Sequence, residues 1–200
     1  MSYGKVEKGK TPEEFELNNM KFYNEAKKNY KDRLHFLSMF SSEWAKVQQI
    51  KNCKILYDET VNSLFTLKSR SKRAGKFDQH TYLVCLHTEL GYGYMFNTKK
   101  HFQKTNRNDL ERFMKLVKSK DSNFDSSWVK DARTWGSSAQ VEGMLETDVK
   151  YYTQPIERLF GWVKNEVYKI SRKTIKEQDQ LEDIYKKAFA KYGIIELFIN

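Results

Sequence analysis

The sequence has little proline, glycine or cysteine. Its 200 residues include only 2 prolines, 9 glycines and 2 cysteines. Because proline and glycine are the residues that most often interrupt helices, their scarcity favours long helical segments. The two cysteines, Cys53 and Cys85, have neither a Cys-x-x-Cys spacing nor histidine partners at metal-ligand intervals. They exclude a disulfide framework and indicate buried thiols of an intracellular protein.

Long apolar runs are also missing. Residues 1–10 contain no apolar signal-peptide segment, and no stretch approaches the ~18 apolar residues of a membrane span. We therefore expect a protein that is neither secreted by the usual signal nor transmembrane. Residues 1–10 are polar and contain two glycines, which predicts a mobile tail.

The common enzyme signatures are absent as well. The chain has no dinucleotide or P-loop phosphate-binding motif, no zinc-peptidase motif and no nucleophile elbow. Its four histidines, His35, His80, His87 and His101, lack the close partners of a metal site. The sequence thus leads us to expect no catalytic residue, metal site or cofactor.

What the sequence does have is helical periodicity. Thr11-Pro12-Glu13-Glu14 is a capping box, and no proline or glycine follows it until after Ser69. Apolar residues recur at three- and four-residue steps over 11–69, including Tyr57 and Val61, and again over 139–192. The pattern predicts a mostly α-helical bundle with long N-terminal and C-terminal helices, formed by one domain over residues 11–200.

The segments between these helices are less uniform. Residues 80–96 fit either a buried helix that ends at Gly91, which we favour, or a small β-hairpin near 81–96. A short amphipathic helix is expected from Asn108, and a short helical turn that contains Trp128 is expected before Gly136. The apolar tail 194–199 should dock on the body or on the partner subunit of a homo-oligomer.

The composition is strongly basic. There are 36 Lys and Arg against 26 Asp and Glu, a formal charge of +10, which favours an anionic partner. Two basic clusters flank an apolar and aromatic run in which Tyr92 and Tyr94 could stack on bases. The cations of these clusters, which could bind phosphates, are Lys68, Arg70, Lys72, Arg73, Lys76, Lys99, Lys100, Lys104 and Arg107.

Two family resemblances suggest alternatives. Arg73 followed by His80 resembles the Arg-x4–6-His pattern of the HEPN family, whose helical bundles often cleave RNA. This resemblance implies that Arg73 holds the scissile phosphate while His80 handles a proton. The proline-poor stretches 11–69 and 139–192 resemble the helices of BAR-domain scaffolds, which hold anionic membranes on cationic faces.

Of these alternatives, the sequence favours a non-catalytic protein that binds RNA or DNA through its phosphate backbone with little base selectivity. A viral or phage packaging or accessory role would fit such a protein. No helix-turn-helix, RNP or KH signature is present, which is why we expect weak sequence selectivity.

Overall fold

The computed structural model describes residues 54–62, 79–101, 104–131, 141–147, 154–170 and 175–198. The predicted tail 1–10, the capping box at Thr11 and the helix predicted up to residue 53 lie outside these ranges.

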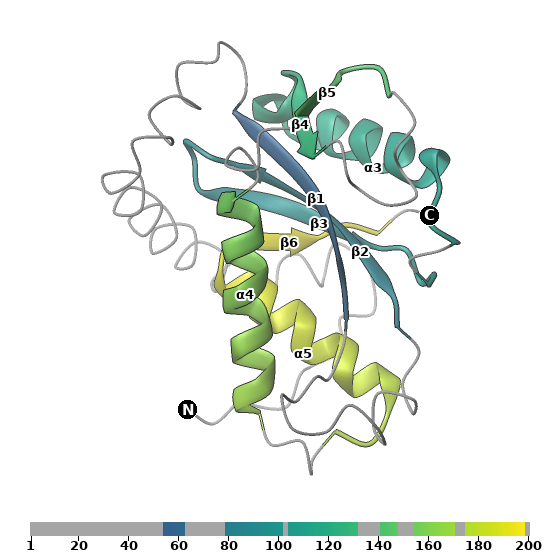
Figure 1. Cartoon of the computed structure of the whole chain (residues 1–200), viewed down its shortest axis with the longest axis vertical. Helices are drawn as coiled ribbons and strands as arrows, with labels where there is room; N and C mark the ends of the chain where they lie inside the picture. Colours follow the sequence, from purple (N-terminus) through teal and green to yellow (C-terminus); the bar gives the residue numbers. More distant parts are fainter. Residues whose placement is uncertain are drawn as a thin grey trace.

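A six-stranded mixed sheet forms the centre of the protein (Figure 1). Its spatial order is β5-β4-β1-β2-β3-β6. Strands β1, β2 and β3 form an antiparallel meander, and the β1–β4, β4–β5 and β3–β6 pairs are parallel. The strands are β1 Ile55–Val61, β2 Thr81–His87, β3 Tyr92–Asn97, β4 Trp128–Asp131, β5 Met144–Thr147 and β6 Ile194–Glu196.

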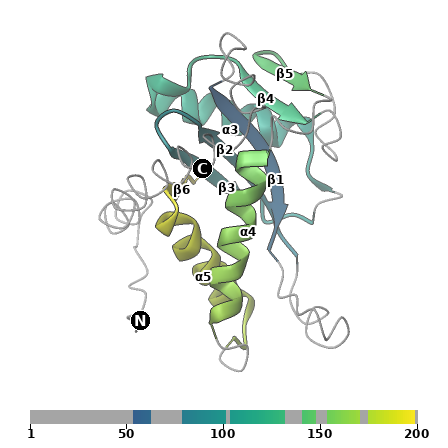
Figure 2. The ribbon, with the colours of Figure 1, turned by 60° about the vertical axis from the view of Figure 1, so that its left-hand side comes forward.

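Helices cover both faces of this sheet (Figures 1 and 2). Helices α4 (Gln154–Lys169) and α5 (Gln178–Lys191) pack on one face, against Leu56, Val84 and Met95. Helix α3 (Arg107–Lys120) and the 3₁₀ turn η3 (Ser122–Phe124) cover the other face. All seven residues of β2 are buried because the strand lies in the middle of the sheet with both faces covered.

The prediction of a mostly α-helical bundle is therefore wrong, because the described residues form an α/β fold. Tyr57 and Val61 were assigned to a helical stripe but belong to β1. Trp128 lies in β4 rather than in a helical turn, and β5 lies within the stretch predicted as a helix from residue 139. These strands are only four to seven residues long, and over so short a stretch the spacing of apolar residues does not separate a strand from a helix.

Of the two alternatives for residues 80–96, the favoured helix is wrong and the hairpin is confirmed. Strands β2 and β3 pair antiparallel from Tyr82 with Asn97 to His87 with Tyr92. Gly91, which we took as a helix end, lies in the connecting turn with φ 72°. This positive φ suits glycine, which has no Cβ to clash.

The amphipathic helices were predicted correctly. Asn106 caps α3 through a capping box with Asp109, two residues before the expected start at Asn108. The stripes predicted after Pro155 and before Gly193 correspond to α4 and α5, and their apolar residues are buried. The tail docks on the body: Ile194, Ile195 and Leu197 are buried within the chain, and so they offer no apolar surface to a second copy.

Candidate functional site

One end of the sheet collects the segments that carry the predicted basic clusters. Strands β1 and β3 finish there and β2 begins there, and we call it the basic end. The backbone N–H of Asn62 donates to the His80 carbonyl at 3.0 Å, and that of Thr81 donates to the Lys100 carbonyl at 2.9 Å. The chain leaves the described structure at Asn62 and returns at Gln79. Both ends of the 63–78 connection therefore lie beside the start of the 98–107 segment.

The first basic cluster falls within that connection. Its members lie outside the described residues, so the structure does not place their side chains. They are Lys68, Arg70, Lys72, Arg73 and Lys76.

The second basic cluster is largely engaged in ion pairs. Lys99 pairs with Glu182. The Lys100 ammonium lies 2.7 and 2.8 Å from the two carboxylate oxygens of buried Asp109. Lys100 therefore helps to fix the start of α3.

The two remaining cations of this cluster lie at the surface. Arg107 pairs with Glu111 at 2.6 Å, and both Arg107 and Lys104 are exposed. Since exposed ion pairs contribute only about 0–1 kcal/mol, a phosphate could compete for Arg107.

The two tyrosines proposed as stacking platforms are anchored to the protein. The hydroxyls of Tyr92 and Tyr94 donate to the same Asp121 carboxylate oxygen at 2.6 and 3.0 Å. Burial and the Asp121 hydrogen bond raise the pKa of Tyr92 to about 12. Only 4% of Tyr92 is exposed, so its ring packs in the core and offers no free face to a base.

A polar cluster that the sequence did not reveal lies at the basic end, between the sheet and α5. Successive residues of a strand point to opposite faces, and Leu56, Tyr82 and Met95 face the α4–α5 layer. Asn62, His80 and Asn97 lie at even spacing from these three residues, so they belong to the same face. We call the resulting set the His80 cluster: Asn62, His80, Tyr82, Asn97, Lys99, Gln178 and Glu182.

Glu182 on α5 is the centre of this cluster. Its carboxylate lies 2.6 Å from Nδ1 of His80, pairs with Lys99 and accepts from the Gln178 amide at 3.4 Å. Burial alone would raise the pKa of Glu182, but the hydrogen bond and charge of Lys99 outweigh burial and lower it. Glu182 is therefore a buried carboxylate beside a cation, with only 5% of its side chain exposed.

Several buried polar groups lie around Glu182. Among the described residues, the side-chain nitrogen of Asn97 and the side-chain oxygen of Gln178 make no hydrogen bond. Burial, followed by the charges of Glu182 and Glu196, raises the pKa of Tyr82, and the Asn62 side chain interacts with the Tyr82 hydroxyl. Buried polar groups are normally paired, so these two unpaired atoms, one donor and one acceptor, are exceptions.

Lys99 also has an unusual backbone conformation. Its φ is 55°, and no other non-glycine residue in the described ranges has a positive φ. The Lys99 N–H donates to the Asn97 side-chain oxygen at 2.9 Å, which holds this turn in place. Left-handed lysine is uncommon, and strained residues of this kind cluster at functional sites.

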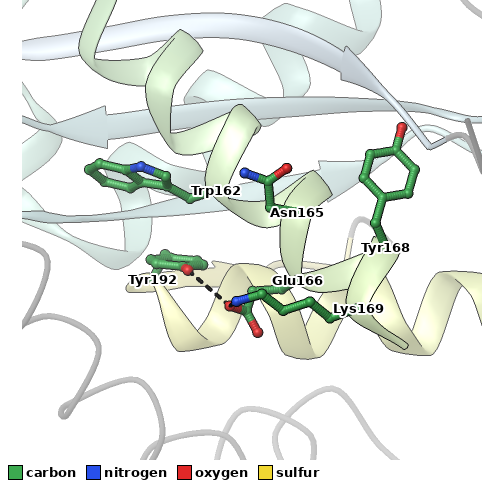
Figure 3. Close-up of a pocket in the computed structure, with 6 residues that line it drawn as sticks. All are labelled: Trp162, Asn165, Glu166, Tyr168, Lys169 and Tyr192. Carbon is green, nitrogen blue, oxygen red and sulfur yellow. Dashed lines mark hydrogen bonds and ion pairs between the residues drawn. The ribbon is translucent and has the colours of Figure 1, made fainter. Parts of the chain in front are cut away.

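A separate open pocket lies between α4 and α5 (Figure 3). It has a volume of about 580 Å³, and the rings of Trp162 and Tyr192 lie at one side with centroids 5.8 Å apart. Its acidic group, Glu166, lies 3.0 Å from each of the Lys169 and Lys191 ammonium groups. Because these charges compensate Glu166 and the pocket is roughly 15 Å along α5 from Glu182, we treat it as distinct from the His80 cluster.

The described part of the chain gives no sign of a metal site or a membrane span. Within it, no group of three or more His, Cys, Asp or Glu side chains is placed to bind a metal ion. None of the helices described is both long and apolar enough to cross a bilayer.

Comparisons with known proteins do not assign the chain to a family. No protein-family model matches the sequence, and no curated protein shows significant similarity to it.

Sequence reasoning found His80 and Lys99 but did not connect them. Glu182 was missed because it belongs to the polar side of a helical stripe that is distant in sequence. Asn62 and Asn97 follow apolar runs, and such polar residues at strand ends would have been a usable signal once the strands were known.

Proposed function

We propose that the protein binds nucleic acid, RNA or DNA, through the phosphate backbone and with weak base selectivity, at the basic end of the sheet. The observation that carries this proposal is that both basic segments start or finish at this end. Phosphate contacts by lysine and arginine dominate binding of this kind, and a net charge of +10 supports it. An intracellular location, consistent with the free buried Cys85, is part of the proposal.

Helix α3 extends the cationic surface beyond the predicted residues. It begins close to the basic end, and its buried side holds the acidic Asp109 together with apolar residues. The cations exposed along this helix are Arg107, Arg112, Lys115 and Lys120. A phosphate backbone could therefore continue from the basic end along α3.

The described fold lends no support to the two family-based alternatives. HEPN proteins are helical bundles, whereas His80 precedes the central strand of a mixed sheet. A BAR-like scaffold needs long helices, whereas α4 and α5 have 16 and 14 residues. An anionic membrane surface is therefore an outcome of the test below rather than a second proposal.

The test is a salt titration of binding to single-stranded RNA, single-stranded DNA and anionic liposomes. Changing Arg70, Lys72 and Arg73 to Glu should weaken nucleic-acid binding. It should also reduce the slope of log K against log salt by about 2, because each lost phosphate contact removes about 0.7 from the slope.

The matched control changes three cations away from the basic end to Glu: Lys54 before β1, Arg158 in α4 and Lys187 in α5. This control makes the same change in net charge away from the basic end and should leave the slope nearly unchanged. Equal loss in both variants, or binding to liposomes alone, would contradict the proposal.

A further inference from the structure

Building on nucleic-acid binding, we propose that the His80 cluster cleaves RNA, with His80 as the general base that activates a ribose 2′-hydroxyl. In this site Glu182 is a positioning residue and Lys99 binds the reacting phosphate. The arrangement of these side chains, the unpaired Asn97 amide nitrogen and the nature of the bound polymer support this proposal.

The first step concerns the orientation of His80. Its Nδ1 is 2.6 Å from the Glu182 carboxylate, which leaves Nε2 as the ring nitrogen that can accept a proton from a substrate. In enzymes that activate a nucleophile, the general base is commonly held in orientation by another polar group, and Glu182 would hold His80 in this way. The contact departs from the angle of a straight hydrogen bond, and such contacts commonly become aligned only when substrate binds.

Access and charge form the second step. The His80 side chain is 15% exposed and that of Lys99 is 57% exposed, whereas Glu182 is buried beneath them. A phosphodiester at the surface could thus approach both the imidazole and the ammonium. The left-handed backbone of Lys99 is held by Asn97, which fixes the root of the side chain close to Glu182.

The third step concerns an unpaired donor beside His80. The buried amide of Asn97 lies on the same face of the sheet as His80, and its nitrogen makes no hydrogen bond among the described residues. An amide nitrogen donates, and a phosphate oxygen could accept from it.

The reaction can be written without a further reactant. His80 takes the proton of the 2′-hydroxyl as the 2′ oxygen forms a bond to the adjacent phosphorus. The bond from phosphorus to the 5′ oxygen breaks, that oxygen takes a proton from water, and His80 returns its proton to solvent. The products are a 2′,3′-cyclic phosphate and a 5′-hydroxyl, and Lys99 stabilises the negative charge that develops on the phosphoryl oxygens.

RNA is the favoured substrate because its own 2′-hydroxyl, the nucleophile, lies beside the phosphorus. An intramolecular nucleophile of this kind reacts much faster than one that must first be brought to the phosphorus. DNA lacks the 2′-hydroxyl and should bind without being cut.

The sequence predicted no catalytic residue because it contains none of the common motifs. A short motif cannot include two residues as distant in sequence as His80 and Glu182.

The experiment uses the full chain and three 12-nucleotide probes of one sequence: RNA, DNA and fully 2′-O-methylated RNA. Wild type should cut only the RNA and leave 2′,3′-cyclic phosphate ends. His80→Gln should lower kcat by about 10²–10⁴-fold, the usual contribution of a general base. Glu182→Gln should lower kcat at least about tenfold with little change in KM. Lys99→Gln should both raise KM and lower kcat, because Lys99 binds the phosphate and stabilises the charge that develops on it.

Controls separate this inference from folding and from nucleic-acid binding. Glu157→Gln, an exposed carboxylate of α4, should leave cleavage unchanged after the same purification. Binding to the 2′-O-methyl probe measures association without cleavage, and circular dichroism checks each variant for folding.

Three results would overturn the inference. The first is that the wild type binds the methylated probe but leaves the RNA probe uncut. The second is cleavage that persists in folded His80→Gln, and the third is DNA that is cut as readily as RNA. The first of these would leave the proposed nucleic-acid binding intact. If the wild type binds none of the probes, the proposed nucleic-acid binding itself is rejected.

Discussion

Buried glutamates hold several lysines of this protein in ion pairs. Glu166, Glu182 and Glu196 are buried, and each of them pairs with at least one lysine. The partners are Lys169 and Lys191 for Glu166, Lys99 for Glu182, and Lys186 for Glu196. A buried carboxylate without a cation would be costly, so these lysines stabilise the junction of α4, α5 and the sheet. The number of lysines and arginines therefore overstates the cations that are not already paired.

The Glu166 pair predicts a specific dependence of stability on pH. Burial would raise the pKa of Glu166, but Lys191 and Lys169 outweigh burial and lower it to about 2, from 4.5. A carboxyl with a depressed folded-state pKa stabilises the fold above its unfolded pKa and loses that contribution as pH falls toward 2. The free energy of unfolding should therefore differ more between wild type and Glu166→Gln at pH 6 than at pH 3.

Denaturant titrations of both proteins at the two pH values measure this difference. A gap between wild type and variant that stays constant, or widens at pH 3, would show that the ion pairs do not depress this pKa.

At the scale of elements, sequence patterns identified the helices but not the strands. The stripes of α3, α4 and α5 record burial on one helix face, which is local information. Strand β1 instead pairs with β2 and, in parallel, with the distant β4, so its burial depends on contacts that spacing does not encode. For the same reason the sequence did not predict the His80 cluster, because His80 and Glu182 come together only after α5 packs on the sheet.

Two glycines provide a test of how tightly the elements pack. A Cβ on Gly93 would lie 1.8 Å from the carbonyl oxygen of Cys85 in the neighbouring β2, whereas one on Gly161 in α4 would meet nothing within 4 Å. Gly93→Ala should therefore destabilise the protein by at least about 1–3 kcal/mol, since backbone must move. Gly161→Ala should stabilise it by about 0.5–1 kcal/mol, because alanine favours helix.

Urea denaturation of the two variants in parallel measures both effects, and each variant serves as the control for the other. A Gly93→Ala protein as stable as wild type would contradict the close pairing of β2 with β3.

At the scale of the whole molecule, the topology brings charged and polar side chains together at one end of the sheet. The meander places the exits of β1 and β3 beside the entry of β2, and α5 brings Glu182 to the same place. Both basic segments, the strained Lys99 and the His80 cluster thus meet at the basic end. The pocket of Figure 3 and the β5 edge carry no comparable combination of features.

The most direct test of this account is amide hydrogen exchange of the full chain with and without the 2′-O-methyl RNA probe, which binds without being cut. The account predicts slower exchange on binding in segments 60–82 and 97–108, with no change at β5 or around Tyr192. Protection confined to the α4–α5 pocket, or no protection under saturating probe, would contradict the claim that nucleic acid binds at the basic end.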